Sequence, residues 1–268
     1  DIIQYAFLQR AIIAGTLIAV LCSVLGVFLV LRRLSLIGDG LAHVTFGSVA
    51  LALLFRFQSV YTSIAAIPCV LLSALGILKI AEKARIYGDA AIGIVSSLGI
   101  AGGILLASLA GGFNVDLFSY LFGNILSISP AELLVTAVLF VIVLLTVTVL
   151  YNDLFAITFD EELAITSGIR VDRINAILVL LTALTVVLAM KVVGIMLISA
   201  LLILPAVSAL QVARGFKAAI ILSICLGVGS VAGGIFLSFL INLPTGATII
   251  IINFLLFATA FLVRKLLR

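Results

Sequence analysis

The chain of 268 residues is 65% hydrophobic and only 10% charged, with a mean hydropathy of +1.49. A soluble domain carries about 25% charged residues, so this composition excludes a water-exposed globular surface, and it also excludes a disordered or collagen-like chain. The apolar runs are long and lack the polar alternation of outer-membrane strands. They predict an all-α polytopic membrane protein with a single transmembrane domain over residues 1–268.

Nine apolar runs each approach the roughly 20 residues that cross a bilayer core. In chain order they cover residues 11–31, 36–55, 62–80, 90–110, 131–150, 174–190, 192–210, 218–241 and 247–263. The sixth and seventh runs meet at Met190–Ile195, where a re-entrant pair also fits, so counts of eight and ten stay open. The first run is longer than a signal-peptide core and no A-x-A pattern follows it, so we expect no signal peptide.

Five clusters of basic residues are separated from one another by two runs each, so they share one side of the membrane. They hold 12 of the 15 Lys and Arg residues: Arg32, Arg33, Lys79, Lys83, Arg85, Arg170, Arg173, Arg214, Lys217, Arg264, Lys265 and Arg268. The positive-inside rule makes that side the cytoplasm, with the N-terminus outside and the C-terminus inside. The net charge of +4 then reflects topology and contact with anionic membrane lipid, and no nucleic acid is expected as a partner.

Ionisable side chains inside a span cost about 2.5–3.5 kcal/mol each on insertion scales, so those in the second run need a reason. This run holds Asp39 and His43, the chain's single histidine. Four positions apart on a helix, both side chains can reach one divalent cation such as zinc, manganese or iron. Two ligands make an incomplete site, which a second copy of the chain could complete. The structural alternative is that Asp39 caps the helix and His43 donates to it or to a nearby carbonyl.

The cytoplasmic loop 151–173 contains a second pattern. Thr158, Phe159, Asp160 and Glu161 fit a capping box, with Glu162 also in the first turn and Gly168 as a stop. This predicts a short helix over residues 159–167. So short a helix is unstable alone in water, so it needs the bilayer surface or a partner protein, and its acidic first turn favours the protein.

The external segment 111–130 has apolar residues at helical spacing, interleaved with polar ones. They are Phe113, Leu117, Phe118, Leu121 and Phe122, with Asn114, Asp116 and Ser119 between them. The pattern predicts an amphipathic segment in the membrane interface. Phe113, Asn114, Asp116 and Phe118 are candidates for an external gate or docking element, and a plain membrane-surface anchor explains the pattern equally well.

Small residues mark the places where helices can approach closely. Gly99 with Gly103, and Gly229 with Gly233, form G-x-x-x-G pairs, which predict packing within one subunit and leave a dimer seam as the alternative. The three cysteines, Cys22, Cys69 and Cys225, lie in apolar runs without a C-x-x-C pair, so we expect small buried hydrophobes.

Three catalytic motifs are missing from the sequence. It has no G-x-x-x-x-G-K-[ST], no H-E-x-x-H and no G-x-S-x-G. We therefore expect no enzyme and no stably bound cofactor, and any ATP must act through a partner subunit. A self-sufficient secondary metal transporter or channel is the alternative, but a proton-coupled one would want more carboxylates in the spans than Asp39 and Glu132.

Three segments resemble a known family. They are Gly26–His43 (GVFLVLRRLSLIGDGLAH), Phe159–Ala164 (FDEELA, with Gly168 following) and Val193–Ala206 (VGIMLISALLILPA). In this order, and over essentially the whole chain, they are similar to the ABC-3 type permeases, the membrane subunits of bacterial zinc, manganese and iron importers. The resemblance implies a permease of the type II, vitamin B12 importer-like class with about eight or nine transmembrane helices.

The resemblance also implies partners and site residues. It implies a permease homodimer in the bacterial cytoplasmic membrane, two cytosolic ATPase subunits and an extracytoplasmic metal-binding protein. Asp39 and His43 match the family's Asp-x-x-x-His pair, which is proposed to contact the passing metal. Residues 158–168, with Leu163, match the coupling helix that docks on the ATPase. Many members have Pro-Gly after the pair, whereas this chain has Thr45-Phe46-Gly47-Ser48, which is more similar to zinc-type members and favours zinc over manganese.

Overall fold

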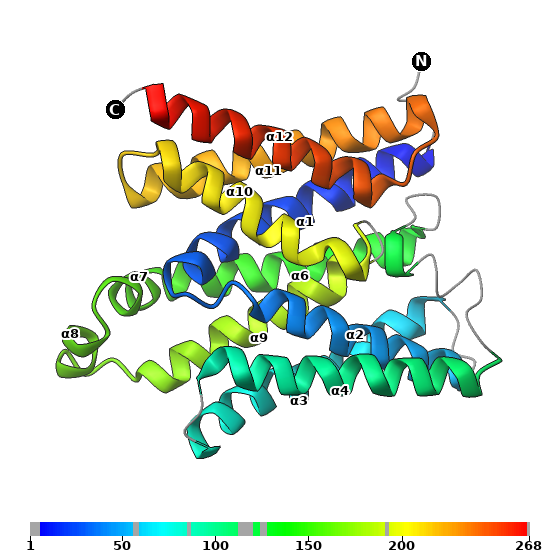
Figure 1. Cartoon of the computed structure of the whole chain (residues 1–268), viewed down its shortest axis with the longest axis horizontal. Coiled ribbons are helices and arrows are strands. Elements are labelled where there is room, and N and C mark those ends of the chain that lie inside the picture. The colour runs from blue at the N-terminus through cyan, green and yellow to red at the C-terminus, as the bar shows by residue number, and fades with distance from the viewer. Residues whose placement is uncertain are drawn as a thin grey trace.

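The computed structural model describes residues 6–55, 59–84, 87–111, 120–123, 128–190 and 193–266, and their regular structure is helical (Figure 1). The elements are α1 (Ala6–Leu31), α2 (Ile37–Leu54), α3 (Ser59–Ala84), α4 (Gly88–Leu109), α6 (Pro130–Val149), α7 (Tyr151–Phe159), α8 (Glu161–Thr166), α9 (Val171–Ala189), η3 (Ile195–Leu197), α10 (Ile198–Val212), α11 (Phe216–Ile241) and α12 (Thr245–Leu266). The all-helical prediction is confirmed.

Among the described residues, eight helices are long and apolar enough to cross a membrane, and α10 is a shorter apolar helix. The seventh predicted run, residues 192–210, is not one long helix. A 3-10 turn, η3, precedes the 15 residues of α10. Gly194 precedes η3 with φ +92, where a Cβ would lie 2.5 Å from the carbonyl oxygen of Leu121. Close approach of the backbone at residues 121–123 explains why the helix does not begin earlier.

The long helices run back and forth between two ends of the molecule (Figure 1). The end that carries α7 and α8 also holds the last turns of α1, α3, α10 and α12 and the first turns of α9 and α11. The described members of all five basic clusters lie in or next to these turns. The prediction that the clusters share one side is confirmed, and we refer to this side as the basic end.

Three of the long helices described here are mostly buried. Over the most apolar 18 residues of each helix, 72% in α1, 67% in α2 and 61% in α9 are buried. The corresponding share is 22% in α3, α4, α6 and α12. The outer helices expose large apolar side chains such as Leu105, Leu134, Leu145 and Phe254. Such side chains suit contact with lipid tails, so the burial pattern agrees with a membrane-embedded bundle.

The G-x-x-x-G pair of α4 brings that helix against α2. A Cβ at Gly99 would lie 2.8 Å from His43 O and from Val44 N, and one at Gly103 would lie 2.5 Å from the ring of Phe46. Packing within one subunit is therefore confirmed for this pair. In α11 the close approaches fall elsewhere, at Gly227 and Gly234, whereas a Cβ at Gly229 would meet nothing within 4 Å.

The cysteines differ in burial. Cys22 lies in the core of α1, as expected, and Cys69 is half-buried. Cys225 is exposed on α11, so the expectation of burial was wrong for this residue. An apolar run on an outer helix has a lipid-facing side, and periodicity alone did not assign Cys225 to it.

Candidate functional site

The Asp39–His43 pair lies at the start of α2. His43 Nε2 is 3.5 Å from Asp39 Oδ2, one helical turn away, and the two side chains are 18% and 49% exposed. The residue before the helix is Leu36, which makes no side-chain cap, so Asp39 occupies the first turn and is not the N-cap. Asp39 as the helix cap is therefore wrong, whereas the other part of that alternative, a contact between His43 and the Asp39 carboxylate, agrees with the structure.

A third polar group reaches this pair from α10. Ser199 Oγ donates to Asp39 Oδ1 at 3.5 Å. On the other side of the imidazole, the buried Nδ1 of His43 has no hydrogen-bond partner among the described residues. The site thus combines a carboxylate, an imidazole and a hydroxyl, all of which can bind a divalent transition metal.

Small residues allow the neighbouring helices to hold α2 closely at this site. A Cβ at Gly38 would lie 2.6 Å from Leu202 Cδ1 of α10, and one at Gly40 would lie 2.6 Å from Ile92 Cγ2 of α4. Together with Gly99 beside His43, these contacts fix α2 between α4 and α10. The backbone of α2 is thus closely packed at the site, whereas the Asp39 side chain stays partly exposed.

The described residues of one chain do not complete a metal site. No cluster of three or more His, Cys, Asp or Glu side chains is found within those ranges. One carboxylate and one imidazole, with a hydroxyl at the edge, bind a metal weakly, since stable sites have about four protein ligands. Weak binding suits a site from which the metal must leave again.

The second predicted feature, the short helix in loop 151–173, differs in detail. The sequence predicted one helix over 159–167 with a Thr158–Glu161 capping box, whereas the structure has two helices, α7 and α8, separated at Asp160. Asp160 is the N-cap of α8, and its Oδ1 accepts from Leu163 N at 2.9 Å. Thr158 instead donates to Leu154 O inside α7, and Phe159 is the last residue of that helix. The capping-box prediction was wrong because the hydroxyl bonds back to its own helix.

The end of α8 agrees with the sequence. Gly168 has φ +85, and the next amide, Ile169 N, donates to Ala164 O at 3.0 Å. A left-handed glycine that closes the last turn is the expected helix stop. Along α8, Ala164 is buried, whereas Leu163 and Ile165 are 62% and 57% exposed. A six-residue helix with exposed apolar side chains at the basic end is suited to docking on a partner protein.

An ion pair connects α8 to the turn between α1 and α2. Arg32 Nη2 donates to Glu161 Oε2 at 3.0 Å, and the two side chains are 8% and 53% exposed. Burial lowers the pKa of the Arg32 guanidinium, and the Glu161 carboxylate opposes that shift. The sequence assigned Arg32 to topology alone and missed this contact, because the two residues are 129 positions apart.

Phe216 connects α7 to the start of α11. Its ring centroid lies 5.2 Å from that of Phe155, 5.6 Å from Phe159 and 5.2 Å from Phe28 of α1. These aromatic pairs attach α7 to two of the long helices at the basic end.

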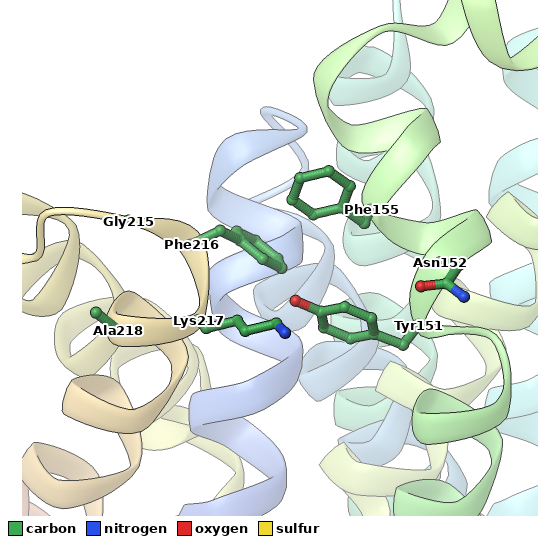
Figure 2. A pocket seen from close by; sticks show the side chains of 7 residues that line it. All are labelled: Tyr151, Asn152, Phe155, Gly215, Phe216, Lys217 and Ala218. Atoms are coloured by element: carbon green, nitrogen blue, oxygen red, sulfur yellow. The ribbon is translucent and has the colours of Figure 1, made fainter.

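A pocket of about 500 Å³ lies beside these rings (Figure 2). Lys217 from α11 and Tyr151 from α7 point toward one another in this view. The lining residues are Tyr151, Asn152, Phe155, Gly215, Phe216, Lys217 and Ala218. None of them is a carboxylate, imidazole or thiol, so the pocket is not a second metal site.

The predicted external gate or docking residues, Phe113, Asn114, Asp116 and Phe118, lie outside the described residues. Near them, Leu121 is buried and Phe122 is 48% exposed.

The chain matches the model of the ABC 3 transport family over residues 4–264. It is 34% identical over 265 residues to the manganese transport system membrane protein MntC of Halalkalibacterium halodurans, covering 97% of this chain and 88% of that protein. It is 35% identical over 260 residues to the manganese import system permease protein ScaB of Streptococcus gordonii, covering 97% and 92%.

Solved structures agree with these matches. The chain superposes on PsaBC from Streptococcus pneumoniae, solved in complex with Fab, with a TM-score of 0.83 and 33% identity, covering 96% of this chain and 92% of that chain. A second structure, an ABC transporter in an inward-facing conformation, gives a TM-score of 0.75 at 17% identity, which is a likeness of fold alone.

Proposed function

The chain belongs to the ABC 3 transport family, and from that premise we propose that it is the membrane permease subunit of an ATP-driven importer of a divalent transition metal. The observation that carries the choice of cargo is the Asp39–His43 pair on α2, because ionisable groups in a membrane span are costly and mark functional sites, and this pair of ligand types suits a divalent metal. The chain is the conduit, and ATP hydrolysis belongs to separate subunits, in keeping with the missing phosphate-binding motif.

We propose manganese as the first candidate for the metal and zinc as the second. The sequence around His43 favoured zinc, but the relatives with assigned metals among those described above are manganese proteins. The carboxylate, hydroxyl and imidazole at the site supply two oxygens and one nitrogen, and oxygen-rich donor sets suit manganese better than zinc.

A second copy of the chain would complete the site. The Asp39 side chain is about half exposed although 67% of its helix is buried, so its carboxylate is accessible to a group from outside the chain. In a twofold dimer the same pair would face the metal from the other subunit and double the number of ligands. The assembly we propose therefore has two permeases around one translocation path.

The exposed helix α8 is the proposed coupling element for the ATPase. Its apolar residues Leu163 and Ile165 are available for docking at the basic end, which the positive-inside rule assigns to the cytoplasm. The N-terminus then faces the outside, where a separate binding protein would deliver the metal to the opposite end. The proposed location is the bacterial cytoplasmic membrane.

Metal uptake in cells that carry the complete importer tests this function. Radioactive manganese uptake should be saturable, should fall when the ATPase subunit is inactivated, and should be inhibited more strongly by unlabelled manganese than by zinc or iron. Stronger inhibition by zinc would reverse the order of the two metals. Uptake that persists without the ATPase and follows an ion gradient would replace the proposal with a self-sufficient transporter.

A further inference from the structure

Arg32 belongs to the short connection between α1 and α2, and its side chain leaves that connection to contact α8. The guanidinium is nearly buried, whereas its partner Glu161 is half exposed at the first position of α8. One partner of this ion pair is thus fixed in the bundle, and the other lies on the helix proposed to meet the ATPase.

The connection that carries Arg32 is closed by hydrogen bonds to both helices. Leu34 N donates to Leu29 O at 2.8 Å and Arg33 N to Val30 O at 3.2 Å, with Arg33 in the left-handed region at φ +59. On the other side, Ile37 N donates to Leu34 O at 3.1 Å as α2 begins. A connection this short, held by hydrogen bonds at both ends, can transmit a displacement of Arg32 to the first turn of α2.

Asp39 lies in that first turn, where Ser199 of α10 contacts its carboxylate. We propose that Arg32 is a positioning residue that links the coupling helix α8 to the Asp39–His43 site, so that movement of α8 on the ATPase changes the position of the metal-binding carboxylate. The inference rests on the proposed function, and it adds a defined route between two sites that are far apart in the sequence.

The chemistry of the pair favours a signalling role over a stabilising one. Arg32 Nη1 is buried and lacks a hydrogen-bond partner in the described part of the chain, so part of the desolvation cost is not recovered. A buried guanidinium paired with an exposed carboxylate has an energy that depends on where the carboxylate lies. The pair therefore responds to the position of α8.

A second route also joins the two regions. Helix α8 packs on α7 and α9, and α9 packs on α2. If movement passes through α9 alone, the ion pair is dispensable. An experiment that removes the pair without touching either helix interface separates the two routes.

The test uses the whole importer in proteoliposomes, with ATP hydrolysis and manganese uptake measured on the same sample. Arg32→Gln and Glu161→Gln remove the pair. The controls Arg33→Gln and Asp172→Asn each remove an exposed charge of the same sign outside α8. We expect Arg32→Gln and Glu161→Gln to keep the ATPase bound and active but to lower the metal moved per ATP about fivefold or more. The double variant should lose no more than either single one, and the two controls should match the wild type.

Three outcomes separate the claims. Normal metal-to-ATP ratios in Arg32→Gln and Glu161→Gln, or losses that add in the double variant, overturn the role of the pair. If Arg32→Gln does not assemble, Glu161→Gln decides, since its side chain is half exposed. A wild-type complex that moves no metal with ATP contradicts the proposed function itself, independently of Arg32.

Discussion

Gly99 of α4 lies directly against the backbone of His43 on α2: a Cβ placed on Gly99 would come within 2.8 Å of His43 O. The proposed metal-binding helix is therefore held by a neighbouring helix at the very residue that carries the imidazole. Helix α4 supplies no ligand, but it packs against the backbone of His43. A substitution on α4 should therefore affect the site.

Gly99→Ala should destabilise the protein. The new methyl group meets backbone atoms of α2, which cannot rotate away, and overpacking of this kind costs about 1–3 kcal/mol. We expect a lower melting temperature of the purified permease in detergent and reduced metal uptake. Gly102→Ala is the matched control, because a Cβ there meets nothing within 4 Å. Equal melting temperatures for the two variants would show that the α2–α4 contact is looser than described.

Ser199→Ala should weaken the site without abolishing it. The hydroxyl donates to Asp39 Oδ1 at 3.5 Å, a long hydrogen bond, so its loss should raise the apparent KM for metal about two- to tenfold while assembly is unaffected. Ser208→Ala on the same helix is the control, because Ser208 Oγ donates to Leu204 O of its own helix. An unchanged KM in Ser199→Ala would remove Ser199 from the site.

Asp160→Ala should loosen α8. Losing an N-cap costs about 1 kcal/mol, so we expect hydrogen exchange of the amides of α8 to accelerate about fivefold. Thr158→Ala is the control, since Thr158 bonds to Leu154 O within α7 and not to α8. Acceleration in Thr158→Ala with none in Asp160→Ala would restore the capping box that the sequence predicted.

Phe216→Ala should release α7 from the bundle. Its ring contacts those of Phe28, Phe155 and Phe159, and each aromatic pair contributes about 0.5–1.5 kcal/mol beyond its buried area. Faster hydrogen exchange throughout α7 is the expected result. Phe254→Ala on α12 provides the control, because that ring is 57% exposed on an outer helix. Unchanged exchange in α7 would mean that the aromatic contacts do not hold it.

The architecture could be predicted from the sequence where it depends on local pattern. Apolar runs of bilayer length predicted the long helices, and the spacing of the basic clusters predicted that they lie at one end. Both patterns arise because polar and charged groups are costly in lipid. The prediction of one long helix over residues 192–210 was wrong at its start. Gly194 lies so close to the backbone at Leu121 that η3 and a shorter α10 replace that helix.

The site could be predicted only in part. Spacing along one helix placed Asp39 and His43 on the same face, and the structure has them 3.5 Å apart. The Ser199–Asp39 contact and the Arg32–Glu161 ion pair were not predicted. Their residues are 160 and 129 positions apart, and a single sequence holds no local signal for such contacts. The Thr158 cap failed because the hydroxyl donates to Leu154 O of α7 and does not accept from the amide of Glu161, and sequence alone does not rank these two hydrogen bonds.

The most direct test of the account is ATP-dependent manganese uptake by proteoliposomes that contain the permease, its ATPase and the binding protein, with wild type compared to His43→Ala. Two-ligand coordination per chain makes the imidazole indispensable, so the account predicts that the variant assembles, hydrolyses ATP and loses at least about 90% of uptake, a change of about 1.4 kcal/mol or more. Uptake by His43→Ala at the wild-type rate would contradict the central claim that the metal passes the Asp39–His43 pair.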